Sequence, residues 1–74
     1  SILPAGITDV EGEFEAGNTI SVVNKNGHEL ARGLANYSSE ELDMIKGAKT
    51  SEIENILGHK HFDEVIHRDD LVIL

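Results

Sequence analysis

The chain has 74 residues, no cysteine and a formal net charge of −8, from 14 acidic and 6 basic residues. This length allows one domain at most, and the lack of cysteine excludes disulfides and thiolate zinc sites. The negative charge disfavours non-specific nucleic-acid binding, and no apolar run is long enough to span a membrane. No secretory signal peptide is visible, so we expect a cytoplasmic protein.

The first half of the chain predicts three strands. A turn leads into a short strand predicted near residues 7–11, and a loop follows it. Residues 19–23, TISVV, are rich in β-branched side chains and predict a second strand. Asn26-Gly27 is typical of a hairpin turn, because both positions tolerate a positive φ angle. The return strand is predicted over residues 29–36.

The return strand has two different faces. Because side chains alternate along a strand, large residues share one face and small residues the other. The large face holds Leu30, Arg32 and Leu34, and the small face holds Ala31, Gly33 and Ala35. The small face suits close packing against another element. At Gly33 we favour a bulge or a bend at a barrel corner over a ligand contact.

Two S-x-x-E pairs predict two helix starts. Ser38 and Glu41 have the spacing of a capping box, and the helix is predicted to end at Gly47 after about Lys46. Ser51 and Glu54 repeat the spacing, with Gly58 as the stop. The two caps also explain the serines better than a nucleophilic role does.

The C-terminal tail predicts two more extended segments, at residues 65–67 and 71–74, joined by a tight turn at Asp69-Asp70. The last four residues are all apolar, so they are expected to be buried in a sheet. The whole pattern is five short strands with two small helices before the last pair. It predicts a mainly β, mixed barrel with helical caps.

No catalytic set or phosphate-binding loop is present in the sequence. The alternating carboxylates, Glu11, Glu13 and Glu15, fit a solvated face better than a catalytic pair, which requires a partly dry cleft. His59, His61 and Asp63 form an H-x-H-x-D string that a metal ion could use if it lay on a strand. Because the string follows a glycine in a predicted loop, we expect exposed histidines and no metal.

Few residues could contact RNA. Lys46 and Lys49 are predicted to form a small basic patch with Arg68, and Tyr37 is the most plausible platform for stacking a base. The competing explanation places Lys46 at the end of a helix and packs Tyr37 into the strand-to-helix corner. Arg32 completes the candidate set for RNA binding.

Several strings in this order resemble one family. They are SILPAGITDVEGEFEAGNTISVV, GHELARGLANYSSEEL followed by IKG, SEIENILG, and DEVIHRDDLVIL. Together they are similar to the C-terminal PUA domain of bacterial glutamate 5-kinases, over nearly the whole chain. Gly17-Asn18 departs mildly from the Gly-Asp or Gly-Glu of that family.

The resemblance implies a PUA-like mixed pseudobarrel, a fold often used to bind structured RNA. It also implies a parent enzyme that phosphorylates the γ-carboxylate of glutamate in proline synthesis, with ATP and Mg²⁺ held in a preceding amino-acid-kinase domain. On this view residues 1–74 are a single domain from a longer kinase, without catalytic residues or cofactors of their own. A complete PUA domain usually begins with a further strand and helix, so we expect an open edge that invites a homodimer or strand exchange.

The sequence leaves three alternative functions for the chain. The first is a non-catalytic accessory domain that acts in assembly or regulation of the kinase. The second is an RNA-binding module, which rests on fold analogy and is opposed by the net charge. The third is metal binding by the histidine string.

Overall fold

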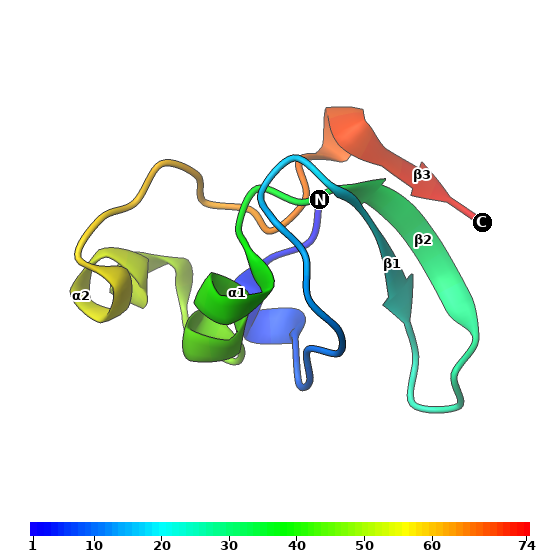
Figure 1. Cartoon of the computed structure of the whole chain (residues 1–74), viewed down its shortest axis with the longest axis horizontal. Coiled ribbons are helices and arrows are strands. Elements are labelled where there is room, and N and C mark those ends of the chain that lie inside the picture. Colours follow the sequence, from blue (N-terminus) through cyan, green and yellow to red (C-terminus); the bar gives the residue numbers. More distant parts are fainter.

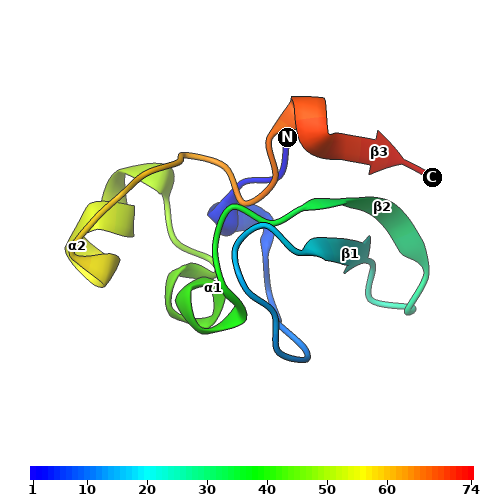
Figure 2. The same cartoon turned by 45° about the horizontal axis from the view of Figure 1, so that its top comes forward.

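A three-stranded antiparallel sheet forms one side of the molecule in the computed structural model, which describes all 74 residues (Figure 1). The strands, in the order β1-β2-β3, are β1 (Thr19–Val23), β2 (Glu29–Leu34) and β3 (Leu71–Ile73). The helices α1 (Ser39–Ile45) and α2 (Ile53–Leu57) lie on the other side (Figures 1 and 2). Three short 3-10 helices complete the structure: η1 (Pro4–Gly6), η2 (Thr50–Glu52) and η3 (Arg68–Asp70).

The predicted hairpin is confirmed. β1 and β2 pair with a bulge between Val22 and Val23, and Gly27 adopts a left-handed φ of 83° in the turn. The Asn24 side chain accepts hydrogen bonds from the backbone N–H groups of Asn26 and His28. This side chain therefore holds the turn in place from the residue that precedes it.

The first capping box is also confirmed. Ser38 Oγ accepts from the Glu41 N–H at 3.2 Å, and Glu41 Oε1 accepts from the Ser38 N–H at 3.0 Å. Leu42 and Ile45 are buried on the inner face of α1, and Gly47 follows the helix with a φ of 77°. The change from the small residues of β2 to polar residues is therefore the start of a helix.

The second capping box does not form. Ser51 lies inside η2, and no side chain caps the start of α2. The chain enters α2 through this 3-10 turn, so Ser51 is not at the N-cap position. Gly58 ends α2 with a φ of 83°, as predicted.

The two serines give a matched test of helix capping. We expect Ser38→Ala to lower the free energy of unfolding by about 0.5–2 kcal/mol, because it leaves helix N–H groups without a partner. Ser51→Ala should leave the free energy of unfolding nearly unchanged, because Ser51 caps no helix. Chemical denaturation of the two variants measures the difference, and equal losses would contradict the single cap.

Six buried residues form the core between the sheet and the helices. They are Tyr37, Leu42, Ile45, Ile53, Val65 and Ile66. The Tyr37 hydroxyl donates to the Phe62 carbonyl, so this buried polar atom is satisfied. Burial raises the pKa of Tyr37 above its ordinary value. The N-terminal segment is tied to the core by an isolated antiparallel bridge between Ile2 and Ile66.

Two predicted strands are absent. Residues 7–11 form no strand, and residues 8–13 make no backbone–backbone hydrogen bond. Residues 65–67 contribute only the bridge at Ile66. The sheet therefore has three antiparallel strands, and the expected five-stranded mixed barrel is not closed.

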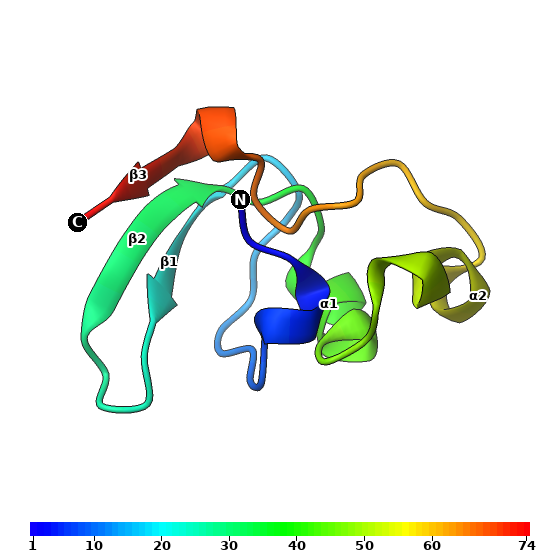
Figure 3. The same ribbon diagram turned by 180° about the vertical axis from the view of Figure 1, so that it is seen from behind.

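An open groove marks the unclosed side. It has a volume of about 820 Å³ and lies between the segment before β1 and β1 itself. Ile7, Val10, Phe14 and Val22 line it and pack at the margin of the core. Seen from behind, η1 lies against α1, where the Gly47 N–H donates to the Pro4 carbonyl at 2.8 Å (Figure 3).

Gly33 allows a close approach between β2 and the turn before β3. A Cβ atom built on Gly33 would lie 2.5 Å from the Asp70 carbonyl oxygen and 2.7 Å from Ile66 Cγ2. The small face of β2 is therefore packed tightly, as predicted. No bulge forms at Gly33: the pairing of Val22 with Ala31 and Val23 with Glu29 skips Leu30, so the extra residue of the bulge lies in β2.

Candidate interaction surface on the outer face of the sheet

The outer face of the sheet exposes a group of apolar side chains. Leu30 and Leu34 on β2, with Val72 and Leu74 at β3, form this group, here called the outer sheet patch. Val72 pairs with Arg32, which places Leu34, Val72 and Leu74 on one face, and the Leu74 N–H donates to the carbonyl of Leu30, the extra residue of the β2 bulge. Their exposed fractions are 43–62%. The prediction that the apolar C-terminus is buried is therefore wrong, because β3 is the last strand of the sheet and nothing covers it.

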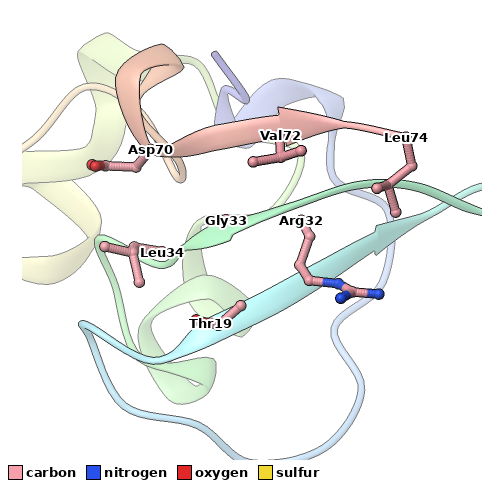
Figure 4. Close-up of a pocket in the computed structure, with 7 residues that line it drawn as sticks. All are labelled: Thr19, Arg32, Gly33, Leu34, Asp70, Val72 and Leu74. Atoms are coloured by element: carbon pink, nitrogen blue, oxygen red, sulfur yellow. The ribbon is translucent and has the colours of Figure 1, made fainter.

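A hollow of about 290 Å³ lies within the patch, and its seven lining residues are labelled in Figure 4. Leu34, Val72 and Leu74 project from two neighbouring strands around its floor, which is formed at Gly33 (Figure 4). Arg32 is the only cation in the lining. The hollow is shallow and open, so its shape suits an apolar protein surface better than an enclosed small molecule.

Arg32 is fixed by its own strand. Its Nε and one terminal nitrogen donate to the two Glu29 carboxylate oxygens at 2.9 and 2.7 Å, and Ser21 Oγ donates to the same carboxylate at 2.5 Å. The Arg32 and Ser21 hydrogen bonds lower the pKa of Glu29 to about 2, and the carboxylate raises the pKa of Arg32. The single charged pair on this face is therefore neutral as a unit.

Acid titration tests this pair. Because its folded-state pKa lies below the unfolded value, Glu29 stabilises the fold above about pH 4.5, and this contribution is lost as the pH falls towards about 2. We expect the Glu29 carboxyl signal in NMR spectra to titrate near pH 2 in the original chain. It should titrate at a clearly higher pH, closer to the ordinary 4.5, in Arg32→Gln, where the largest cause of the shift is gone and the Ser21 hydrogen bond remains. Lys46→Gln is the control, because Lys46 pairs with Asp43 instead, and a low Glu29 pKa in Arg32→Gln would contradict the assignment.

Comparison with known proteins identifies the fold. The PUA domain model matches residues 1–57. The chain belongs to the PUA domain family. Over all 74 residues it is 58% identical to the glutamate 5-kinases of Caldanaerobacter subterraneus subsp. tengcongensis and Thermoanaerobacter sp. strain X514. It is 56% identical to the glutamate 5-kinase of Dictyoglomus turgidum over 73 residues.

This PUA domain spans only about a fifth of the length of those relatives, and it matches their C-terminal region. The resemblance noted from the sequence strings is therefore confirmed. No helix of the domain is both long enough and apolar enough to cross a membrane.

The residues proposed for RNA binding lie on several different elements of the PUA domain. Tyr37 is only 2% exposed, so its ring is not available to stack on a base. Arg32 lies on β2, Lys46 and Lys49 follow α1, and Arg68 lies in η3. Arg32 and Lys46 are also paired with Glu29 and Asp43.

The histidine string of the PUA domain lies in the exposed segment after α2. The His59 and His61 rings are 5.1 Å apart, His59 Nε2 lies 3.4 Å from a Glu41 oxygen, and Asp63 pairs with Lys60 at 3.0 Å. No group of three or more histidine or carboxylate side chains converges in a way that could hold a metal ion. Glu11, Glu13 and Glu15 are all exposed.

Sequence reasoning missed the outer sheet patch. Arg32 and Leu34 lie on one face of β2 as alternation predicts, whereas Leu30 is the extra residue of a bulge, and the last four residues were expected to be buried. The available signal was the last four residues, Leu71 to Leu74, which carry no charge to protect an edge strand.

Proposed function

We propose that these 74 residues are a non-catalytic accessory domain of a longer glutamate 5-kinase, acting in its assembly or regulation. The observation that carries this proposal is the match along the whole chain to enzymes about five times as long. The parent would phosphorylate L-glutamate with ATP to give L-glutamyl 5-phosphate in the cytoplasm. ATP and Mg²⁺ would be held by its other part.

The side chains of the domain support this division of labour. The Ser38 hydroxyl is used in the helix cap, and the Ser39 hydroxyl is used in hydrogen bonds with the Phe14 backbone. The histidines and the exposed carboxylates do not form a shaped, partly dry cleft of the kind that catalysis requires. The polar groups of the domain thus maintain its backbone structure.

The test compares the 74-residue chain with the full-length parent in a glutamate- and ATP-dependent phosphoryl-transfer assay. We expect activity in the parent and none in the 74-residue chain. Deleting the domain from the parent should alter subunit assembly or inhibition while glutamyl phosphate is still formed. Phosphoryl transfer by the 74 residues alone would overturn the proposal, as would a parent without glutamate kinase activity.

RNA binding is the alternative function for a PUA domain. One binding measurement distinguishes it from the role of an accessory domain. At about 50 mM salt, where phosphate contacts are strongest, we expect no retention of structured RNA by the domain, whose net charge is −8. Retention that falls steeply with added salt would favour the RNA-binding function instead.

A further inference from the structure

The outer sheet patch points to a contact that the 74 residues do not make among themselves. We propose that it packs against an apolar surface belonging to the rest of the longer chain. This inference rests on the proposed function, and it names the part of the domain that serves assembly. The occupant is the portion of the parent outside these 74 residues, which makes up about four fifths of the relatives' length, since the chain covers 20% of each.

The first argument is the unpartnered apolar surface. Val72 and Leu74 are 61% and 62% exposed, although they lie beside β2 in the sheet, and Leu34 continues the same face beside Arg32. A group of exposed apolar side chains on one face of a sheet is typical of an interaction site, whereas scattered exposed leucines are ordinary. The hollow beside Arg32 is a depression in the patch, and a protruding apolar side chain of the partner surface could fill it.

The second argument is charge. Glu29 neutralises Arg32 within the domain, so the remaining charge at the hollow is the Asp70 carboxylate in its lining. The domain as a whole carries −8, and a second copy would bring the same charge to the contact. The charge distribution therefore favours an apolar partner that is not another copy of the domain.

The third argument is size. Stable interfaces between separate proteins bury about 800 Å² on each partner, and four partly exposed side chains around a shallow hollow fall short of that. A surface within the same polypeptide needs less, because the tether provides an effective concentration in the millimolar range. A small patch is thus sufficient for docking within one chain.

Limited proteolysis of the full-length parent tests the docking. The double variant V72Q/L74Q removes two apolar side chains from the patch without adding charge. The matched control, I73Q/M44Q, removes two exposed apolar side chains elsewhere: Ile73 is 72% exposed on the opposite face of β3, and Met44 is 57% exposed on α1. The measured quantity is the rate at which a protease releases the C-terminal domain under native conditions.

We expect V72Q/L74Q to raise the release rate about tenfold and the control to stay within about twofold of the original chain. Both double variants of the 74-residue chain should unfold at the same temperature, which separates undocking from unfolding. If V72Q/L74Q unfolds at a lower temperature than the control, hydroxyl-radical labelling of the unaltered parent tests the docking instead. Patch leucines labelled several-fold less in the parent than in the 74-residue chain would then support docking.

Equal release rates in the two double variants, or patch leucines labelled equally in the parent and in the 74-residue chain, would overturn the inference. Release rates or labelling that fall with increasing protein concentration would also overturn it, because they would identify a second copy as the occupant. The kinase assay is independent of these readouts. A parent without glutamate kinase activity whose patch is nevertheless protected would refute the proposed function and leave the docking surface in place.

Discussion

Replacing Ile45 with alanine is expected to lower the free energy of unfolding by about 2–5 kcal/mol. Ile45 is 0% exposed and lies in the core that joins α1 to Ile53 and Ile66. Removing its outer carbons loses apolar burial and leaves a cavity that so small a core cannot fill by rearrangement. Since small domains are stabilised by roughly 5–15 kcal/mol in total, the change takes a large share of the stability. Urea denaturation followed by circular dichroism measures it.

The neighbouring residue gives the control for this substitution. Met44 is 57% exposed in the same helix, so Met44→Ala removes a side chain of similar size from a position that faces solvent. We expect it to change the free energy of unfolding by less than about 0.5 kcal/mol. Similar losses in the two variants would mean that α1 does not bury the face described here.

The second large effect is expected at Gly33, where a larger residue has no room. A Cβ atom at 2.5 Å from the Asp70 carbonyl oxygen and 2.7 Å from Ile66 Cγ2 is too close to both, so Gly33→Ala must displace the backbone of η3 and the Ile66 side chain. We expect a loss of about 1–3 kcal/mol, which is typical of overpacked sites. Thermal unfolding measures the loss, and hydrogen exchange at β3 should speed up because β3 follows η3 directly.

Gly6→Ala is the matched control for Gly33→Ala. A Cβ atom at Gly6 would meet nothing within 4 Å. The substitution should be neutral or stabilise the domain by up to about 1 kcal/mol, because alanine restricts the unfolded chain more than glycine does. If both glycine variants lost stability equally, the contact between Gly33 and Asp70 would not be the cause.

The elements predicted correctly from the sequence are those fixed by local chemistry. The hairpin depends on Asn26-Gly27 and β-branched neighbours, and α1 depends on the reciprocal bonds of Ser38 and Glu41. Such signals act over a few residues and do not require knowledge of the rest of the fold. The glycine stop of α2 belongs to the same class.

The elements predicted wrongly depend on partners distant in the chain. Residues 7–11 have strand-forming composition, but a strand requires a neighbour to pair with, and these residues pair with none. Ser51 has the correct spacing to Glu54, yet the preceding 3-10 turn moves the helix start past it. In both cases the tertiary structure overrides a plausible local pattern.

The candidate site could be predicted only in part. Alternation along β2 placed Leu30 and Leu34 on one face, but the sequence does not specify which strand lies at the edge of the sheet. At Tyr37 the sequence left two alternatives, a platform for stacking a base or packing into the strand-to-helix corner. The second describes its position in the structure, where the hydroxyl donates to the Phe62 carbonyl and the ring lies in the core.

The bridge between Ile2 and Ile66 also sets the order in which the domain can be completed during synthesis. The Val65 N–H donates to the Ile2 carbonyl at 2.7 Å, and the Ile2 N–H donates to the Ile66 carbonyl at 3.0 Å. These bonds join residues more than 60 positions apart. Closing this loop therefore costs more chain entropy than closing any shorter loop in the domain. On the ribosome the hairpin and α1 can form early, but the core stays unsealed until Ile66 has left the exit tunnel, and the nascent chain exposes its apolar residues until then.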